Sequence, residues 1–307
     1  MGKTRCVLLI GAGLGLITAG ARADDAADCD QQYDPELSIG ACTRYLATPI
    51  DPSEMVLAYE DRGYAYLKTG DFARAQADFD AALKLEPNDA VALAGRGTAH
   101  NAVGDLDGAI ADYNGALALD PQNPVAFYNR GYAFNGKGQY EKAIADFDAA
   151  IAINPQYVVA YIGRGFAHYN TGELDKSVAD YAQAVKLNPL NPTAYDGRGY
   201  AYTSIGAYDK AVADHERALS LNPNDADGYD GRAWANYQAG RPEAALPDVQ
   251  KSLELRPDNP NALDTIGHIL VALGRGDEAV TYLRRAVELA PHMASPRDLL
   301  RDLGVAP

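Results

Sequence analysis

The sequence predicts an all-α solenoid of stacked antiparallel helix pairs, and three series of regularly spaced residues carry this prediction. Prolines recur every 34 residues, at positions 87, 121, 155, 189, 223, 257 and 291. Glycines recur with the same period, at positions 70, 104, 138, 172, 206, 240 and 274. Alanine, or serine at position 177, occupies positions 75, 109, 143, 177, 211, 245 and 279. Three series in one register indicate an internal repeat, which is typical of a solenoid.

Each repeat reads as a helix, a turn and a second helix. In the segment from Pro124 to Tyr157, Gly138 ends the first half, because glycine accepts the positive φ of a helix C-terminus. Pro155 ends the second half, because proline cannot continue a helix. The apolar residues between these two positions recur at helical spacing. The sequence therefore predicts two helices in every repeat.

Seven such repeats fill residues 56–293. The residue before a repeat is in most cases a good helix N-cap, and these residues are Asp89, Asn123, Asn191, Asp225 and Asn259. Three of them precede a proline, which is favoured as the first helical residue. Met55 and Tyr157 depart from this rule, so the sequence defines the helix starts at these two positions less sharply.

The segment from Pro124 to Tyr157 resembles the tetratricopeptide repeat family. The family pattern W-x2-L-G-x2-Y…A-x3-F…P is met by Phe127, Gly131, Phe134, Ala143, Phe147 and Pro155, whereas Arg130 stands where leucine is usual. The resemblance covers the chain except for its two ends, and we class it as an arginine–glycine variety in a secreted bacterial protein. It implies a right-handed superhelix with a concave groove, which the first helices line.

The place of Arg130 holds an arginine in six repeats, and an aspartate follows sixteen residues later. A partly buried charge requires a partner. The seventh repeat has Ile266 and Tyr282 at these places, so both residues change together. We therefore expect pairs within each repeat, which makes the arginines fold residues; anion binding is the alternative. The six predicted pairs are Arg62 with Asp78, Arg96 with Asp112, Arg130 with Asp146, Arg164 with Asp180, Arg198 with Asp214, and Arg232 with Asp248.

In the family, the groove is lined chiefly by the second, fifth, ninth, twelfth and thirteenth places of each repeat. Here these places are rich in aromatic side chains, which are typical anchors for a partner, although packing on the adjacent first helix is an alternative. We favour binding most for Tyr200, Trp234 and Tyr237. The predicted groove residues are Tyr64, Asn101, Tyr128, Tyr132, Asn135, Phe166, Tyr169, Asn170, Asp196, Tyr200, Asp230, Trp234, Tyr237 and Asp264.

The groove composition favours a protein or peptide partner that is basic or neutral. Three aspartates lie beside the aromatic residues of the last repeats, which suits a segment with lysine or arginine. Lys68 is the only lysine among the groove places, so a clamp for a C-terminal carboxylate lacks its ligands. The net charge of −15 argues against nucleic acid, whose phosphates require basic side chains.

Two other functions fit parts of the pattern. A glycan-binding module would stack sugars on the aromatic row and use Asn101, Asn135 and Asn170 for their hydroxyls. A purely structural solenoid would engage partners with its convex face. We expect no enzyme, cofactor or metal site, because the sequence has no metal-ligand spacing and no catalytic or phosphate-loop motif. His268 is on the groove face, but the sequence shows no nucleophile partner for it.

The first 23 residues read as a secretory signal peptide, and we expect a periplasmic or secreted protein. Lys3 and Arg5 precede an apolar run that includes VLLIGAGLGLITAG, and the cleavage pattern ends at Ala23. The run is short for a bilayer span, so we expect no stable membrane insertion after cleavage. Its glycines do not fit the dinucleotide-binding fingerprint, because Leu16 stands at the sixth place.

Residues at the two ends differ from the repeats, and we expect them to cap the solenoid. Residues 24–55 predict a degenerate helix pair, with a short first helix near residues 27–32. Cys29 and Cys42 predict a disulfide bond in an oxidising compartment, with two free thiols as the alternative. Residues 294–307 predict a C-terminal capping helix. Within the sixth repeat, Pro247 predicts a kink, since it removes a helical hydrogen bond.

Overall fold

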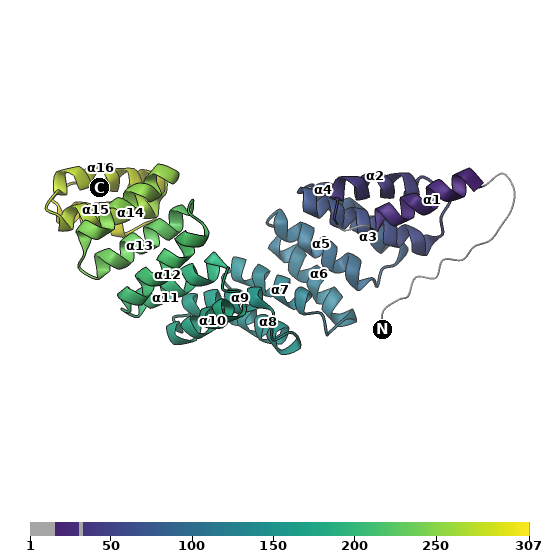
Figure 1. Cartoon of the computed structure of the whole chain (residues 1–307), viewed down its shortest axis with the longest axis horizontal. Coiled ribbons are helices and arrows are strands. Elements are labelled where there is room, and N and C mark those ends of the chain that lie inside the picture. The colour runs from purple at the N-terminus through teal and green to yellow at the C-terminus, as the bar shows by residue number, and fades with distance from the viewer. Residues whose placement is uncertain (1–15, 31–32, 307) are drawn as a thin grey trace. The chain divides into compact units, whose positions relative to one another are not determined.

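The computed structural model describes residues 16–30 and 33–306, with side-chain environments from residue 23 onward. These residues form seventeen α-helices and no strand. The chain divides into two compact units, the N-terminal unit Met1–Gly138 and the C-terminal unit Gln139–Pro307 (Figure 1). The prediction of an all-α array of antiparallel helix pairs is confirmed.

The described part of the N-terminal unit contains seven helices in chain order. They are α1 (Leu16–Cys29), α2 (Pro35–Leu46), α3 (Pro52–Thr69), α4 (Phe72–Leu85), α5 (Ala90–Ala102), α6 (Leu106–Leu119) and α7 (Pro124–Gly136). Each helix packs against the next one in the chain. This pattern of neighbouring contacts is typical of a solenoid.

The C-terminal unit continues the same alternation of first and second helices. Its helices are α8 (Tyr140–Ile153), α9 (Val158–Asn170), α10 (Leu174–Leu187), α11 (Pro192–Ser204), α12 (Tyr208–Leu221), α13 (Ala226–Gln238), α14 (Pro242–Leu255), α15 (Pro260–Ala272), α16 (Gly276–Leu289) and α17 (Ser295–Asp302). Within this unit, too, each helix packs on its neighbour in sequence.

Glycine and proline set the helix ends as the repeat pattern predicts. All seven glycines of the 34-residue series adopt a positive φ, between 68° and 82°. Only glycine takes this left-handed conformation without a steric penalty, so it permits the sharp turn between the two helices. The side chains of Asp89, Asn123, Asn191, Asp225 and Asn259 accept hydrogen bonds from backbone N–H groups of the following helix.

The core repeats a socket in which a large side chain of a second helix meets two glycines of first helices. The Tyr181 ring lies close to Gly165 in its own repeat and Gly197 in the next. An added Cβ would collide with the ring at Gly197 and would fit only tightly at Gly165. Phe79 is held in the same way by Gly63 and Gly95 in the N-terminal unit. The glycines therefore let the helices of adjacent repeats approach closely.

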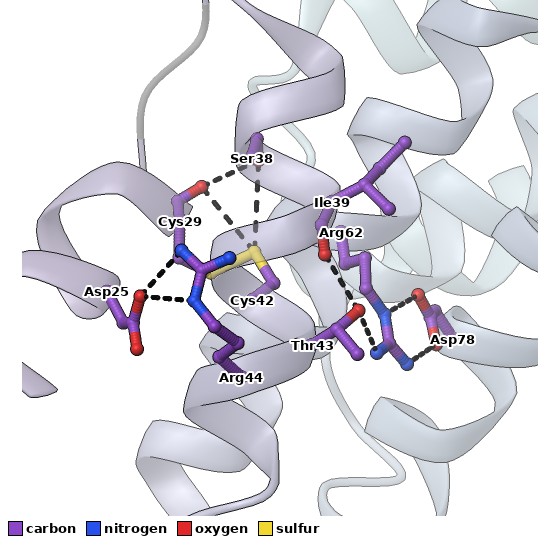
Figure 2. The surroundings of a disulfide bond; sticks show 9 residues. All are labelled: Asp25, Cys29, Ser38, Ile39, Cys42, Thr43, Arg44, Arg62 and Asp78. Carbon is purple, nitrogen blue, oxygen red and sulfur yellow. Dashed lines mark hydrogen bonds and ion pairs between the residues drawn. A yellow bond between two sulfur atoms is a disulfide. The ribbon is translucent and has the colours of Figure 1, made fainter.

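The N-terminal end is closed by α1 and α2, which the Cys29–Cys42 disulfide joins (Figure 2). Both cysteines are buried, and the Ser38 hydroxyl donates to the Cys29 carbonyl oxygen at 2.8 Å. Arg44 on α2 also pairs with Asp25 on α1, with 2.7 Å between Nη2 and Oδ1. The disulfide and these polar contacts therefore hold the first two described helices together.

The first helix differs from its expected position. It spans Leu16–Cys29, whereas the sequence predicts a short helix near residues 27–32. It therefore runs through the predicted cleavage point after Ala23, and cleavage would leave residues 24–29 of this helix. Residues 1–15 of the predicted signal peptide lie outside the described residues.

The first repeat keeps its register from residue 56, but its first helix starts earlier, at Pro52. Asp51 caps α3 in a capping box with Glu54, and Pro52 occupies the first turn, so α3 begins before the repeat does. Helix α14 runs without a break from Pro242 to Leu255 with Pro247 inside it, and a bend at Pro247 stays a prediction.

At the C-terminal end, α17 packs on α15 and α16. Leu300 is fully buried in the same core cluster as Ile266 and Leu283, and Leu299 and Leu303 pack at its edge. Gly304 follows the helix with a φ of +73°. Apolar side chains of the last repeat are thereby covered by one short helix.

Candidate functional site

The first helices form one continuous wall in each unit. In the C-terminal unit, α9 contacts α11, α11 contacts α13, and α13 contacts α15, whereas the described second helices do not contact one another. The first helices therefore lie closer together than the second helices. We call the face formed by α9, α11, α13 and α15 the inner wall of the C-terminal unit.

Five of the six arginines in the repeats bind the aspartate sixteen residues later in two parallel hydrogen bonds. The distances from Nη2 to Oδ1 are 2.7 Å for Arg62–Asp78, 2.6 Å for Arg96–Asp112, 2.6 Å for Arg164–Asp180, 2.8 Å for Arg198–Asp214 and 2.6 Å for Arg232–Asp248. These hydrogen bonds raise the pKa of each of the five arginines. Arg130 and Asp146 belong to different units, and their pairing stays a prediction.

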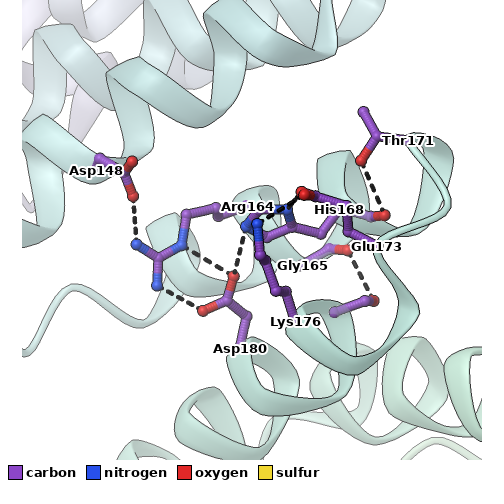
Figure 3. Close-up of polar contacts among 9 residues, drawn as sticks. Asp148, Arg164, Gly165, His168, Thr171, Glu173, Lys176 and Asp180 are labelled. Atoms are coloured by element: carbon purple, nitrogen blue, oxygen red, sulfur yellow. Dashed lines mark hydrogen bonds and ion pairs between the residues drawn. The ribbon is translucent and has the colours of Figure 1, made fainter.

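Several arginines also reach the preceding repeat, which the sequence reasoning missed. Arg164 lies between Asp180 of its own repeat and Asp148 of the repeat before (Figure 3). Arg96 similarly donates to Asp80 at 2.7 Å, and Arg130 donates to Asn114 at 2.6 Å. The sequence spacing could have revealed these contacts, since each acceptor precedes its arginine by sixteen residues. The arginines therefore join repeats to one another and lie in the packing between helices.

The predicted groove residues of the N-terminal unit divide into packed and exposed side chains. The Tyr64 hydroxyl donates to the Val91 carbonyl oxygen at 3.2 Å, and its ring meets the edge of Phe79. Tyr132 is 55% exposed and lies 6.4 Å from the Tyr128 ring, measured between centroids. The two predicted asparagines, Asn101 and Asn135, are half-buried.

In the C-terminal unit, several predicted groove residues serve packing. The Tyr200 hydroxyl donates to the Asp227 carbonyl oxygen at 2.8 Å, and the Tyr200 ring meets the edge of the buried His215 ring. Tyr200 is therefore engaged by the next repeat and is not the free anchor that we favoured. Asn170 donates to the Phe166 carbonyl oxygen within α9, and Ser204 donates to the Tyr169 hydroxyl. Phe166 itself is 46% exposed.

Three rings from the last two first helices form a cluster on the inner wall. Trp234 and Tyr237 on α13 lie 5.3 Å apart between ring centroids. His268 on α15 lies 5.7 Å from Trp234 and 5.9 Å from Tyr237. All three side chains are half-buried, so one edge of the cluster is open to solvent.

The three predicted groove aspartates lie on α11, α13 and α15 in different surroundings. Asp196 Oδ1 is 3.0 Å from Nδ1 of His215, whose ring fills the socket between two first helices. Burial raises the pKa of Asp230 to about 6, and Asp227 and Asp264 add repulsion. Burial also raises the pKa of Asp264. The C-terminal half of the wall is therefore acidic, with its carboxylates set into the surface.

His268 has a hydroxyl neighbour that the sequence did not reveal. Its Nε2 lies 3.0 Å from Oγ of Ser295, which donates to Oδ2 of Asp264 at 2.6 Å. In a catalytic serine site the hydroxyl proton faces the histidine, whereas here it faces the aspartate. The network connects α15 to the first residue of α17. The residues of this network are about thirty positions apart in sequence, and they meet because α17 packs on α15.

Within the described residues, no helix is long and apolar enough to cross a bilayer. The same residues contain no group of three or more histidine, cysteine or acidic side chains placed to hold a metal ion.

Comparison with solved structures shows that the chain shares the fold of tetratricopeptide repeat proteins. A tetratricopeptide repeat protein from Parabacteroides merdae is 22% identical, with a TM-score of 0.65 over 81% of this chain and 98% of that one. The structure of the APC/C hetero-tetramer Cut9–Hcn1 is 17% identical, with a TM-score of 0.70 over 94% of this chain and 55% of that one. YrrB, a protein with "an unusual peptide-binding site", is 23% identical, with a TM-score of 0.50 over 60% of this chain and 95% of that one. At these identities the likeness shows the fold.

No curated protein matches the chain. Tetratricopeptide repeat models match residues 60–124, 124–157, 194–225 and 236–303, and a TPR repeat model matches residues 168–206. Members of this family are generally non-catalytic scaffolds that bind proteins or peptides. Since these matches together cover most of the repeat region, the chain belongs to the tetratricopeptide repeat family.

Proposed function

We propose that this protein is an exported, non-catalytic scaffold that binds a basic peptide segment of a partner protein on the inner wall of the C-terminal unit. The observation that carries the proposal is the combination of Trp234, Tyr237 and His268 with Asp230 and Asp264 on adjacent helices. Aromatic anchors supply buried area, and carboxylates select positive charge.

Export is part of the proposal and rests on two features of the N-terminal region. The first is the predicted signal peptide, which fits secretion to the periplasm or beyond. The second is the buried Cys29–Cys42 disulfide, because such bonds persist in oxidising compartments. N-terminal sequencing of the protein from its native envelope tests this point, and a chain that retains Met1 contradicts it.

Peptide binding is better supported than glycan binding. Asn170, which was a candidate for sugar hydroxyls, donates within its own helix. The wall therefore offers fewer sugar-binding groups than its composition suggests.

A pull-down from the envelope of the source cell tests the function. Wild-type protein and the variants Trp234→Ala and Tyr237→Ala serve as baits, and overlapping peptides of each captured protein locate the bound segment. We expect partners that both variants lose, through segments with lysine or arginine whose binding weakens as salt rises. Identical partners for all three baits would place binding elsewhere, and salt-independent binding that a sugar inhibits would favour a glycan.

A further inference from the structure

Two carboxylate oxygens on the inner wall of the C-terminal unit are buried without a hydrogen-bond partner. They are Oδ1 of Asp230 and Oδ1 of Asp264. Asp264 is only 9% exposed, and it lies on α15 beside the ring cluster. A buried charged oxygen without a partner costs folding free energy, so its retention calls for an explanation.

The second oxygen of the Asp264 carboxylate is already occupied, because Oδ2 accepts the Ser295 hydroxyl at 2.6 Å. Asp264 therefore presents a single acceptor. A guanidinium fork binds best when both oxygens of one carboxylate are free, whereas an ammonium group is a compact charge that makes single hydrogen bonds.

The free oxygen of Asp264 lies next to the aromatic cluster. It is 3.7 Å from Nε2 of His268, whose ring centroid is 5.7 Å from that of Trp234 and 5.9 Å from that of Tyr237. Tryptophan and tyrosine rings attract a cation that lies over the ring face, within about 6 Å of the centroid. The free oxygen of Asp264 therefore lies beside His268 in the ring cluster, and Asp230 adds a second negative charge to this part of the wall.

We propose that Asp264, Asp230 and the rings of Trp234 and Tyr237 form a pocket for the ammonium group of a lysine side chain, and that this pocket selects lysine over arginine. The proposal rests on the peptide-binding function above and names the side chain that the wall recognises. The ammonium donates to Oδ1 of Asp264 and lies against the rings, while its chain follows the wall toward solvent.

Trp234 gives a direct readout, because it is the only tryptophan in the chain. The probes are three end-blocked peptides in which alanine alternates with lysine, arginine or norleucine. We expect the lysine peptide to change Trp234 emission saturably, the arginine peptide to bind about tenfold more weakly, and the norleucine peptide to have no effect. Equal responses to lysine and arginine, or to lysine and norleucine, overturn the proposal, as does the absence of a lysine response at millimolar peptide.

Two variants separate a specific pocket from general attraction to an acidic protein. Asp264→Asn keeps an acceptor for Ser295 but removes the charge, and we expect it to weaken lysine-peptide binding about tenfold. Asp175→Asn removes the same charge from an exposed position on the second helix α10, and we expect it to bind within twofold of wild type. Circular dichroism confirms that both variants fold. Equal weakening by the two variants overturns the proposal.

The two proposals fail in different ways. If the envelope partner binds through a lysine-free segment, or if a labelled lysine peptide binds without a change in Trp234 emission, the lysine pocket is wrong and the scaffold function stands. If Trp234→Ala and Tyr237→Ala capture the same partners as wild type, the site on the inner wall is wrong.

Discussion

The two units share their packing positions but differ on the faces of their first helices. In both, arginine–aspartate pairs and glycine sockets hold consecutive helices together. At the second place of the repeats, the N-terminal unit exposes Leu57, Val91 and Val125. The C-terminal unit instead exposes Thr193, Asp227 and Asn261 at this place. Positions fixed by packing repeat, whereas positions that face solvent have diverged, and these are where a difference in binding is to be found.

The largest expected effect tests whether packing is equivalent in the two units. Arg164→Leu leaves Asp180 buried without its partner, and we expect a loss of about 3 kcal/mol in the free energy of unfolding. The matched change in the N-terminal unit is Arg96→Leu, which leaves Asp112 buried without its arginine partner. Denaturant unfolding measures both, and adding Asp180→Leu or Asp112→Leu should restore stability in part. A double variant less stable than its single variant would contradict the pairing.

The next prediction compares the stability of the N-terminal helices with that of the C-terminal helices. Replacing both Cys29 and Cys42 with serine removes a bond between residues 13 apart in sequence, and we expect a local loss of about 3 kcal/mol. The loss should stay within α1, α2 and the start of α3, because a solenoid repeat contacts only its neighbours. Regional hydrogen exchange measures it. Faster exchange in α15 to α17 would contradict this localisation.

A smaller effect compares buried acids at the fifth place of the repeats. Burial, together with Asp89, raises the pKa of Glu60 to about 8, whereas that of Asp230 rises to about 6. A raised acid pKa favours the protonated folded state, so stability falls as pH rises through each window: 4.5 to about 8 for Glu60, and 3.8 to about 6 for Asp230.

We therefore expect Glu60→Gln to stabilise the protein by about 1 kcal/mol at pH 9, after allowance for solvent screening, and to have little effect near pH 4. The stabilisation of the protein by Asp230→Asn should reach its full value by pH 7. Thermal unfolding at several pH values measures both variants. If the two variants gain stability over the same pH range, the two sites do not differ in the way their surroundings imply.

The smallest effect distinguishes packed from exposed tyrosines at the ninth place. Tyr200→Phe loses the hydrogen bond to the Asp227 carbonyl oxygen, and we expect a cost of about 1 kcal/mol. Tyr132→Phe changes a ring that is 55% exposed, and we expect less than about 0.5 kcal/mol. Equal costs in denaturant unfolding would show that exposure does not separate the two positions.

The sequence by itself determined the repeat and the local chemistry of each helix pair. The 34-residue period, the glycine turns, the N-caps and the arginine–aspartate spacing all act over short distances along the chain, so the residues alone are enough to reveal them. The same local rules identified the tetratricopeptide repeat. The start of α3 at Pro52 was not predicted, although Asp51, Pro52 and Glu54 form a capping signal that the same local rules can read.

Only the tertiary structure decided which groove residues are free. Tyr200 and Trp234 occupy equivalent places, yet the Tyr200 hydroxyl donates to the Asp227 carbonyl oxygen on α13, whereas Trp234 joins a ring cluster. Ser295 reaches Asp264 because α17 folds back on α15. Such contacts depend on how neighbouring helices approach, which the repeat period does not encode. The arginine bridges to the preceding repeat have the same origin, since distance in space, not in sequence, sets an electrostatic partner.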